Sequence, residues 1–427
     1  MDIAIIHDLF LKCTSVSIDT RKIQQHSFFV AIKGENFDAN TFAKEALEKG
    51  ASYVVIDNSD YFIDHRTILV SDSLSTLQEL AKFHRNYLKL PIIALTGSNG
   101  KTTTKELIHV VLSSKYKTKA TVGNLNNHIG VPLTLLSFTS ETEIGIVEMG
   151  ANHKKEIEFL CALAQPDFGY ITNFGKAHLE GFGGVAGVIE GKSEMYHFLS
   201  ENNKRAFVNL EDPIQVEKTK SFNQYTFGIN KQEANVSITK VTANPFVTIE
   251  FQDVIITSHL IGLYNANNLN AAIAIGKYFE IPNIAIKSAL EGYVPENNRS
   301  QMISKGTNQI ILDAYNANPS SMAVAIENFK QLDKPNKIVV LGDMLELGEE
   351  SFQEHKQIVD SLLHQEDIVC HFVGADFYTQ RLNKVNFHFH FAFEDLAWYL
   401  KTQPIVASTL LIKGSRGMAL ERVLDVL

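Results

Sequence analysis

The feature that most restricts the fold of this 427-residue chain is the segment Leu95-Thr-Gly-Ser-Asn-Gly-Lys-Thr-Thr-Thr104. An apolar run, Ile92–Leu95, precedes it, and a helical pattern with Leu107, Val110 and Val111 follows it. Its two glycines permit a tight turn, so successive backbone N–H groups can converge on a phosphate at the start of the helix. A strand, a glycine-rich loop and a helix in this order indicate an α/β domain that binds a nucleotide.

The loop is a shortened form of the usual phosphate loop, because Leu95 stands where the first glycine of G-x-x-x-x-G-K-[ST] would be. A lysine and a hydroxyl still follow the second glycine, where they can reach the terminal phosphates and Mg²⁺. The expected ATP-binding residues of the loop are Gly97, Ser98, Asn99, Gly100, Lys101 and Thr102.

Candidate metal ligands follow two other strand-like runs. Glu148 ends the run Ile144–Val147, and a carboxylate at a parallel strand end beside a phosphate loop can bind Mg²⁺. His178 follows Gly169–Thr172, but a lone histidine is usually structural and Mg²⁺ prefers oxygen, so the residues alone leave its role open. The alternating Phe387–Phe391 segment (FHFHF) predicts a strand with two different faces rather than a metal site.

Changes of pattern predict three domains, at residues 1–89, 90–298 and 299–427. The first has a small mixed pattern, and the other two alternate apolar strands with helices, which implies parallel sheets. Residues 222–262 show period-two stretches and are expected to form an antiparallel appendage of the central domain. The polar segment 294–299 is the expected linker. The expected strands include Ser27–Ile32, Tyr53–Ile56, Ala206–Asn209, Ile310–Leu312, Ile338–Leu341, Ile368–Val373 and Leu410–Ile412.

Composition excludes several classes of protein. With 39 Lys and Arg against 48 Asp and Glu, the net charge of −9 argues against a nucleic-acid binder. No apolar run approaches the ~20 residues that a membrane span needs, and the N-terminus lacks a signal-peptide pattern. Three distant cysteines, Cys13, Cys161 and Cys370, offer no disulfide framework. We therefore expect a cytoplasmic protein with no membrane insertion.

Two segments near the C-terminus carry weaker signals. Asp313, in Leu312-Asp-Ala-Tyr-Asn-Ala-Asn-Pro-Ser320, could accept hydrogen bonds from ribose hydroxyls, and the asparagines could bind peptide-like groups. Lys413-Gly-Ser-Arg416 offers two cations to an anion, but an ordinary basic surface loop explains it equally well.

Together with further segments, these motifs resemble the Mur ligases, the ATP-dependent amide-forming enzymes of peptidoglycan precursor synthesis. Three of the motifs are similar to those of the family member that adds D-alanyl-D-alanine to UDP-N-acetylmuramoyl-tripeptide. The resemblance implies three domains: a small mixed UDP-binding domain, a central P-loop ATPase-like domain with a parallel sheet, and a C-terminal Rossmann-like domain. The matching segments include 96–106, Gly123-Asn-Leu-Asn-Asn-His-Ile-Gly-Val-Pro132, 147–152, 173–178, 191–194, 265–272, 313–319, Val340-Leu-Gly-Asp-Met-Leu-Glu-Leu-Gly348 and 413–416.

The resemblance also implies roles for single residues. Lys101, Lys192 and His178 would be catalytic, with Thr102, Glu148 and His178 around Mg²⁺. Lys192 matches a lysine that the family carboxylates, and as a carbamate it could hold a second Mg²⁺. The other implied ATP-binding residues are Asn268 (adenine), Arg299 (phosphates) and Asp313 (ribose). The implied substrate-binding residues are Thr20, Arg21, Asn126, Asn127, Tyr315, Asn316, Asn318, Lys413 and Arg416.

Three positions depart from the family pattern: Thr20 in Asp19-Thr-Arg21, Ala39 in Asp38-Ala-Asn40, and Tyr264 in place of a frequent histidine. They put the nucleotide contacts in doubt, not the reaction. Two alternatives stay open: a sister ligase with another amine or acceptor, and a nucleotide-binding protein that is no ligase. We expect a monomer whose last domain closes over the site to exclude water.

Overall fold

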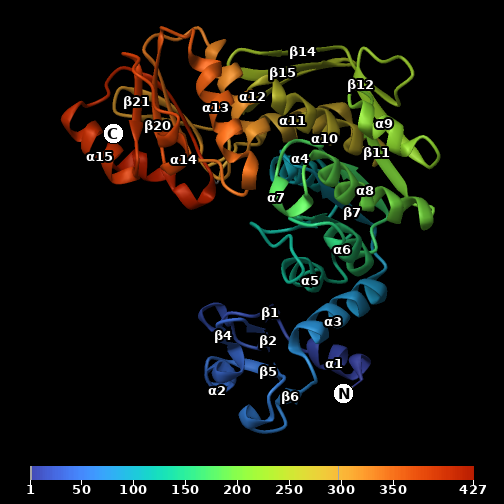
Figure 1. The fold of residues 1–427 in the computed structure, drawn as a ribbon. Helices are drawn as coiled ribbons and strands as arrows, with labels where there is room; N and C mark the ends of the chain where they lie inside the picture. The colour runs from blue at the N-terminus through green and yellow to red at the C-terminus, as the bar shows by residue number, and fades with distance from the viewer. Residues whose placement is uncertain (1, 297) are drawn as a thin grey trace.

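The structure is a computed structural model that describes residues 2–296 and 298–427. Figure 1 shows three bodies in chain order: a small N-terminal one, a large central one, and a C-terminal one beside it. The predicted linker 294–299 includes Asn297, which lies outside the described residues; its other residues form no helix or strand. In the described part of the chain, no helix is both long and apolar enough to cross a membrane.

The N-terminal body contains a four-stranded parallel sheet in the order β1-β2-β5-β6. Its second helix ends at Glu48, and Gly50 follows it with a left-handed φ of 108°. The elements are α1 (Ile3–Phe10), β1 (Ser15–Ser17), β2 (Ser27–Val30), β3 (Lys33–Gly34), β4 (Phe37–Asp38), α2 (Ala43–Glu48), β5 (Ala51–Ile56), β6 (Thr67–Leu69) and α3 (Ser73–Leu88). Helix α3 packs on α5 and α6 of the central body and joins the two.

The central body is built on a seven-stranded parallel sheet in the order β13-β12-β11-β10-β7-β9-β8. Every residue of β7 is buried, because helices cover both faces of the sheet. Ile93 and Leu95 pack on one side against α4 and α10, while Ile92 and Ala94 pack on the other. The strands are β7 (Ile92–Thr96), β8 (Thr118–Ala120), β9 (Ile144–Glu148), β10 (Phe168–Ile171), β11 (Arg205–Asn209), β12 (Gln224–Ile229) and β13 (Val236–Ile238). The helices are α4 (Lys101–Ser113), α5 (Gly130–Leu136), α6 (Glu156–Ala164), α7 (Leu179–Phe182), α8 (Val185–Glu201), α9 (Pro213–Thr219), α10 (Ala266–Tyr278) and α11 (Asn283–Gly292).

The predicted antiparallel appendage is only partly correct. β14 (Lys240–Ala243), β15 (Phe246–Phe251) and β16 (Val254–Ile261) do form a separate antiparallel sheet. β12 and β13, in contrast, extend the parallel sheet to its edge. The prediction was wrong for them because period two reports one buried face, and a parallel edge strand also has one.

The C-terminal body has a six-stranded sheet in the order β17-β18-β22-β19-β20-β21, parallel except for β17 at its edge. The predicted FHFHF strand is confirmed: the Phe389 ring stacks on Phe372, and the histidine face turns to the other side. The elements are β17 (Gln301–Lys305), β18 (Asn308–Asp313), α12 (Pro319–Lys330), β19 (Lys337–Gly342), α13 (Ser351–Leu362), β20 (Ile368–Val373), α14 (Ala375–Thr379), β21 (Phe387–His390), α15 (Phe393–Thr402) and β22 (Thr409–Lys413).

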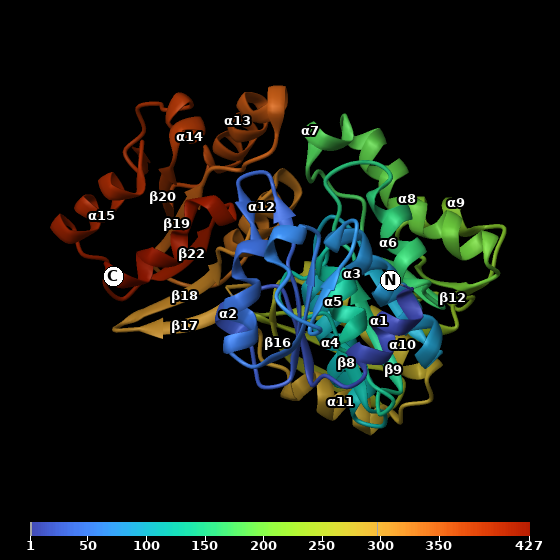
Figure 2. The same cartoon turned by 90° about the horizontal axis from the view of Figure 1, so that it is seen from below.

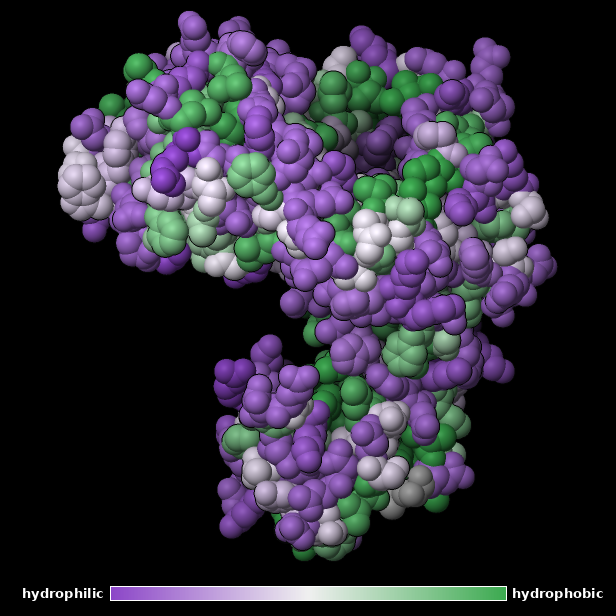
Figure 3. Space-filling view, in the orientation of Figure 1, coloured by the Kyte–Doolittle hydropathy of each residue, from purple (hydrophilic) through white to green (hydrophobic). Residues whose placement is uncertain are grey.

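The three bodies do not fuse into one globule. Figure 2, seen from below, shows the N-terminal body in front of the central sheet and the C-terminal body to one side. The space-filling view in Figure 3 shows a deep notch between the N- and C-terminal bodies, edged mostly by hydrophilic residues.

Candidate active site

The site forms where the strand order of the central sheet reverses. Strand β7 lies between β9 and β10, so the carboxyl ends of these three strands open on one crevice. Ligands of open parallel sheets bind at such switch points. The loop after β7 carries Gly97–Gly100, β9 ends at Glu148, and β10 leads to Thr172 and Asn173.

The phosphate loop is held by close packing that requires its two glycines. Gly97 has a φ of 145°, and a Cβ there would lie 1.9 Å from Thr172 Oγ1. Gly100 has a φ of 79°, and its Cβ would lie 2.6 Å from Asn268 Oδ1. Both values are far below a van der Waals contact, so only glycine fits. The Asn173 side chain fastens the loop further, accepting from Asn99 N–H at 3.0 Å and donating to Asn99 O at 3.0 Å.

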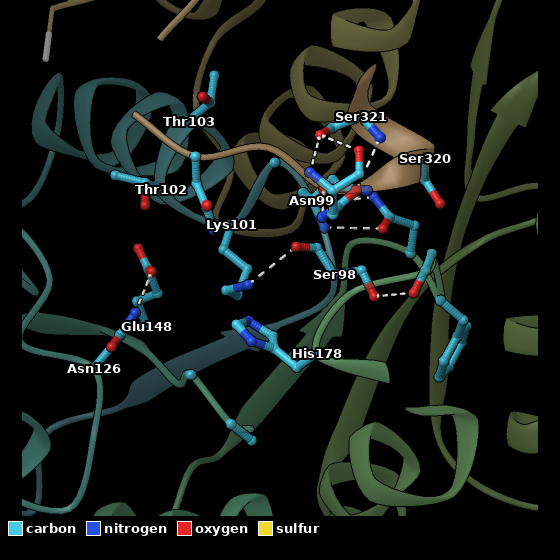
Figure 4. Close-up of a pocket in the computed structure, with 18 of the residues that line it drawn as sticks. Ser98, Asn99, Lys101, Thr102, Thr103, Asn126, Glu148, His178, Ser320 and Ser321 are labelled. Atoms are coloured by element: carbon cyan, nitrogen blue, oxygen red, sulfur yellow. Dashed lines mark hydrogen bonds between the residues drawn. The ribbon is translucent and has the colours of Figure 1, made fainter. Parts of the chain in front are cut away.

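Lys101 begins α4 and curls back over the loop. Its Nζ donates to the carbonyl oxygens of Gly97 at 2.6 Å and Ser98 at 3.3 Å. Burial lowers the pKa of Lys101 and Arg299 adds to this, while the charge of Glu148 opposes it. Figure 4 shows the side chain at the centre of the site, between Glu148 and His178.

Glu148 is 1% exposed, and its two carboxylate oxygens differ in their contacts. Its Oε1 accepts from Asn126 Nδ2 at 2.8 Å, whereas Oε2 has no partner among the described residues. A buried carboxylate oxygen without a partner is costly unless a cation or ligand reaches it. Thr102 Oγ1 is the hydroxyl on the same side of the site in Figure 4. Within residues 2–296 and 298–427, however, no three His, Cys, Asp or Glu side chains form a metal cluster.

His178 and Lys192 are the other two basic residues whose pKa values the charge of Lys101 lowers. His178 adopts a left-handed φ of 53° before α7, and its Nδ1 hydrogen-bonds Glu346 of the C-terminal body. Lys192 is 1% exposed in α8, with its Nζ 5.3 Å from the centre of the Phe182 ring. Burial holds the pKa of Lys192 well below its usual value, and the charge of Lys101 adds to the effect. Burial also lowers the pKa of His178.

The C-terminal body contributes a second set of polar groups from its own strand ends. Asp313 ends β18 and accepts from Lys413 Nζ, at the end of β22, at 2.5 Å. Its other oxygen accepts from Ser300 N–H at 3.1 Å. The Arg299 guanidinium lies 3.6 Å from the centre of the Tyr315 ring. This set therefore presents a carboxylate, two cations and an aromatic ring toward the phosphate loop.

Both sets line one cavity of about 1110 Å³. A volume of this order fits a nucleotide with a second substrate. The predicted residues that line it are Ser98, Asn99, Gly100, Lys101, Thr102, Asn126, Asn127, Glu148, His178, Asn268, Arg299, Asp313, Tyr315, Asn316, Asn318 and Lys413.

Five predicted residues lie outside that lining. Gly97 permits the tight turn of the loop, and Lys192 is buried in α8, where its charge and those of Lys101 and His178 affect one another. Arg416 has a 61% exposed side chain paired with Glu421. Thr20 and Arg21 belong to the N-terminal body, where the 85% exposed Arg21 pairs with Asp19.

Sequence reasoning named Asn99 and Asn318 as site residues but missed the contacts that join the two sets. Asn318 Nδ2 donates to Asn99 Oδ1 at 2.7 Å, which links the C-terminal body directly to the phosphate loop. The backbone N–H of Lys176 donates to Ser320 Oγ at 2.8 Å. Glu346 lies in the quoted segment 340–348 but had no assigned role. No spacing rule predicts such contacts, because each pair is far apart in the chain.

Comparisons with known proteins match the three bodies in turn. Residues 12–89 match the Mur ligase family catalytic domain, residues 95–276 the Mur ligase middle domain, and residues 298–396 the Mur ligase glutamate ligase domain. The UDP-N-acetylmuramoyl-tripeptide–D-alanyl-D-alanine ligase of Bacillus subtilis (strain 168) is 36% identical over 418 residues. That alignment covers 96% of this chain and 92% of the relative.

Solved structures agree over the same length. A crystal structure of MurF from Acinetobacter baumannii has a TM-score of 0.85 at 30% identity, covering 96% of this chain and 92% of the other. The MurF ligase of Thermotoga maritima in complex with ADP has a TM-score of 0.83 at 27% identity, covering 98% and 97%. The similarity therefore extends through all three bodies and their arrangement.

Proposed function

Because the chain belongs to the Mur ligase family, we propose that it joins D-alanyl-D-alanine to UDP-N-acetylmuramoyl-tripeptide at the expense of ATP. The bond formed is an amide, and the product is a precursor of peptidoglycan. One observation carries the proposal: a phosphate loop and the strand ends of a second α/β body line a single cavity. An enzyme that must bring a nucleotide and two further substrates together needs such a composite site.

The reaction needs an activated acyl group, because a carboxylate is a poor acyl donor. The terminal carboxylate oxygen of the tripeptide attacks the γ-phosphorus of ATP, ADP leaves, and an acyl phosphate forms. The dipeptide amine then attacks the acyl carbon, phosphate leaves, and the nitrogen loses a proton. We assign Lys101 to the transferring phosphoryl group, whose charge a cation beside the loop can neutralise. In that role its Nζ exchanges its present loop carbonyl partners for phosphate oxygens.

Glu148 and Thr102 are the residues that we propose for Mg²⁺. The unpartnered Oε2 of Glu148 supports this choice, since an oxygen donor is what Mg²⁺ prefers. When bound, the ion would supply charge neutralisation at the phosphates and orient them for in-line transfer. His178 would complete the site from the side of α7.

We propose that the C-terminal residues hold the nucleoside and close the cavity. Asp313 would accept hydrogen bonds from ribose hydroxyls, and Lys413 holds that carboxylate in place at 2.5 Å. Arg299 and Asn268 would flank the phosphates and the adenine. A docked C-terminal body keeps water away from the acyl phosphate, which water would otherwise hydrolyse.

Lys192 is proposed to carry a carbamate. Burial lowers the pKa of its amine, which favours the neutral form that CO₂ requires. The amine nitrogen would bond to the carbon of CO₂ and release a proton, leaving an anion near the side chain of Lys101. A ¹³C signal from the protein in ¹³C-bicarbonate buffer, lost in Lys192→Arg, tests the modification.

The test of function is phosphate release from ATP and Mg²⁺ with UDP-N-acetylmuramoyl-tripeptide and D-alanyl-D-alanine, omitting each in turn. The proposal expects release only with both, and a product heavier by the dipeptide. Release with the UDP substrate but a different amine would assign the chain to a sister ligase. Release that ignores both substrates would mean that the chain is no ligase. Lysine and diaminopimelate tripeptides run in parallel would identify the acceptor.

Two expectations about the whole protein stay predictions. We propose a monomer, which light scattering on the purified chain would test. We also propose a cytoplasmic location, where the UDP-linked substrate and ATP are both present. Fractionation of cells that produce the chain would test the second point.

The domain boundaries at residues 89 and 298 likewise stay predictions, which limited proteolysis can check.

A further inference from the structure

Two carboxylates of the C-terminal body contact side chains of the loop 173–178 of the central body. Lys176 Nζ pairs with Glu354 at 2.5 Å, and Lys176 N–H donates to Ser320 Oγ. Two residues further along, His178 Nδ1 hydrogen-bonds a carboxylate oxygen of Glu346. The two carboxylates therefore contact neighbouring residues of the same loop, Glu354 through Lys176 and Glu346 through His178. One involves a lysine with no proposed role in the reaction, and the other involves a histidine of the site.

The contact to His178 determines what the ring presents to the cavity. A carboxylate can only accept, so Nδ1 must carry the proton toward Glu346. In the neutral ring, Nε2 then keeps its lone pair. Figure 4 shows the ring beside Lys101, on the wall of the cavity. A histidine oriented by a carboxylate in this way can accept a hydrogen bond or bind a cation through Nε2.

Both residues of this contact have an unusual backbone conformation. His178 has a φ of 53° and Glu346 a φ of 62°, both in the left-handed region that residues other than glycine seldom occupy. Such conformations cost free energy and persist where the surrounding structure requires them. The Glu346 side chain is 58% exposed, so burial does not force its pairing. A contact to so exposed a carboxylate contributes little to stability even when both groups are charged, which makes a purely structural reason weak.

We propose that Glu346 is a positioning residue that fixes the tautomer and orientation of His178 across the domain boundary. His178 is then correctly set only when the C-terminal body is docked, so docking and assembly of the reactive site are one event. The effect on catalysis rests on the proposed function, but the effect on the histidine tautomer does not. Glu346 touches no substrate in this scheme and acts through His178.

The chain offers a matched control in Glu354. It comes from the same C-terminal body and contacts the same loop, but it pairs with Lys176 rather than with His178. If Glu346 served only to hold the bodies together, removing either carboxylate would have the same effect. If it positions His178, only its own removal changes the imidazole.

The first experiment needs no activity. ¹⁵N spectra of the full chain with labelled histidine, assigned with His178→Gln, report which ring nitrogen carries the proton at pH 8. We expect the Nδ1–H tautomer in the parent and in Glu354→Ala, and a shift toward Nε2–H in Glu346→Ala. An Nε2–H tautomer in the parent, or no change in Glu346→Ala, would overturn the proposal.

The second experiment measures phosphate release at saturating substrates. We expect Glu346→Ala to lower kcat by roughly 10–100-fold, the range for groups that orient a functional histidine. Glu346→Gln keeps an acceptor oxygen and should recover most of the loss, while Glu354→Ala should change KM values more than kcat. Equal losses of kcat in Glu346→Ala and Glu354→Ala would mean that Glu346 only helps to dock the C-terminal body, and this result would overturn the proposal. A parent without dipeptide-dependent release would instead refute the proposed function, and the tautomer result would still decide the role of Glu346.

Discussion

The two large sheets turn the carboxyl ends of their strands toward the same cavity, but they bring different kinds of residue to it. The central sheet supplies a continuous strand–loop–helix segment, in which Gly97, Gly100 and Lys101 follow one another within five residues. The C-terminal sheet supplies single residues from separate strand ends, Asp313 from β18 and Lys413 from β22. The phosphate site that we propose thus lies within the central body, whereas the roles that we propose for the C-terminal residues require that body to be docked.

The largest effect should come from the central segment. Lys101→Ala should lower kcat by about 10³-fold, because the cation nearest the transferring phosphoryl group is lost. The free energy of unfolding should hardly change, since the hydrogen bonds of Lys101 Nζ to described residues all end on carbonyl oxygens of its own loop. Steady-state phosphate release and a thermal melt check both statements. Turnover within tenfold of the parent would show that the loop lysine is not central to the chemistry.

The metal requirement should depend on the central body as well. Glu148→Gln keeps an acceptor for Asn126 but removes the carboxylate charge. The Mg²⁺ concentration for half-maximal rate should rise by at least the roughly 10–100-fold that outer-shell changes cause. Asp212→Asn is the matched control, because it also removes a carboxylate from the cavity lining while keeping a good helix cap for α9. Equal Mg²⁺ dependence in the two variants would count against Glu148 as a ligand.

Low pH should destabilise the C-terminal sheet through its buried histidines. His371 and His390 are buried in the C-terminal sheet, 3.1 Å apart between ring nitrogens, with the His388 ring stacked on His371 and Tyr399 covering them. Burial lowers the pKa of His371 to about 3 and that of His390 to about 4, the latter opposed only in part by Asp395.

Unfolded histidines titrate near 6.5, so below that pH the unfolded chain binds more protons than the folded one. The unfolding free energy therefore falls as pH falls from about 6.5 toward 4, by about 2 kcal/mol for each of the two histidines at pH 5. Proteolysis in rising urea, at pH 8 and pH 5, should release C-terminal fragments at lower urea at pH 5. His371→Phe should reduce the difference. An unchanged urea midpoint for these fragments would show that the histidines do not destabilise the sheet.

The smallest effect concerns the direct link between the two sets of residues. Asn99→Ala and Asn318→Ala each remove one end of the 2.7 Å hydrogen bond between the phosphate loop and α12. In a double-mutant cycle on kcat/KM for ATP, the coupling should be about 1 kcal/mol, as for a single neutral hydrogen bond. Strictly additive losses would mean that the bond does not couple the nucleotide site to docking.

The same contrast explains which parts of the site could be predicted. The phosphate loop could be read directly, because strand, glycines, lysine and helix are adjacent in sequence. Glu148 could be found by its place after a strand. Asp313 gave a weaker signal of the same kind, whereas Asn268 and Lys192 were assigned only through the resemblance to a family, since nothing in their local spacing sets them apart. Glu346, Ser320 and Asn318 gave no signal of their contacts, because each partner lies far away in the chain.

The predicted elements show the same limit. Period and turn residues identified the strands, such as Ile92–Thr96 and Phe387–His390, because burial on one or both faces is recorded locally. They could not say that β12 joins a parallel sheet, since strand partners are set by topology.

The sequence by itself determined three α/β units, a phosphate loop and the family to which the chain belongs. Only the tertiary structure decided that Asp313 and Lys413 line the same cavity as the loop, that one Glu148 oxygen has no partner among the residues it describes, and that Glu346 reaches His178. The physical reason is how far apart in the sequence the interacting residues lie. Backbone conformation and burial pattern depend on neighbours along the chain, whereas a composite site depends on contacts that form only when separate bodies dock.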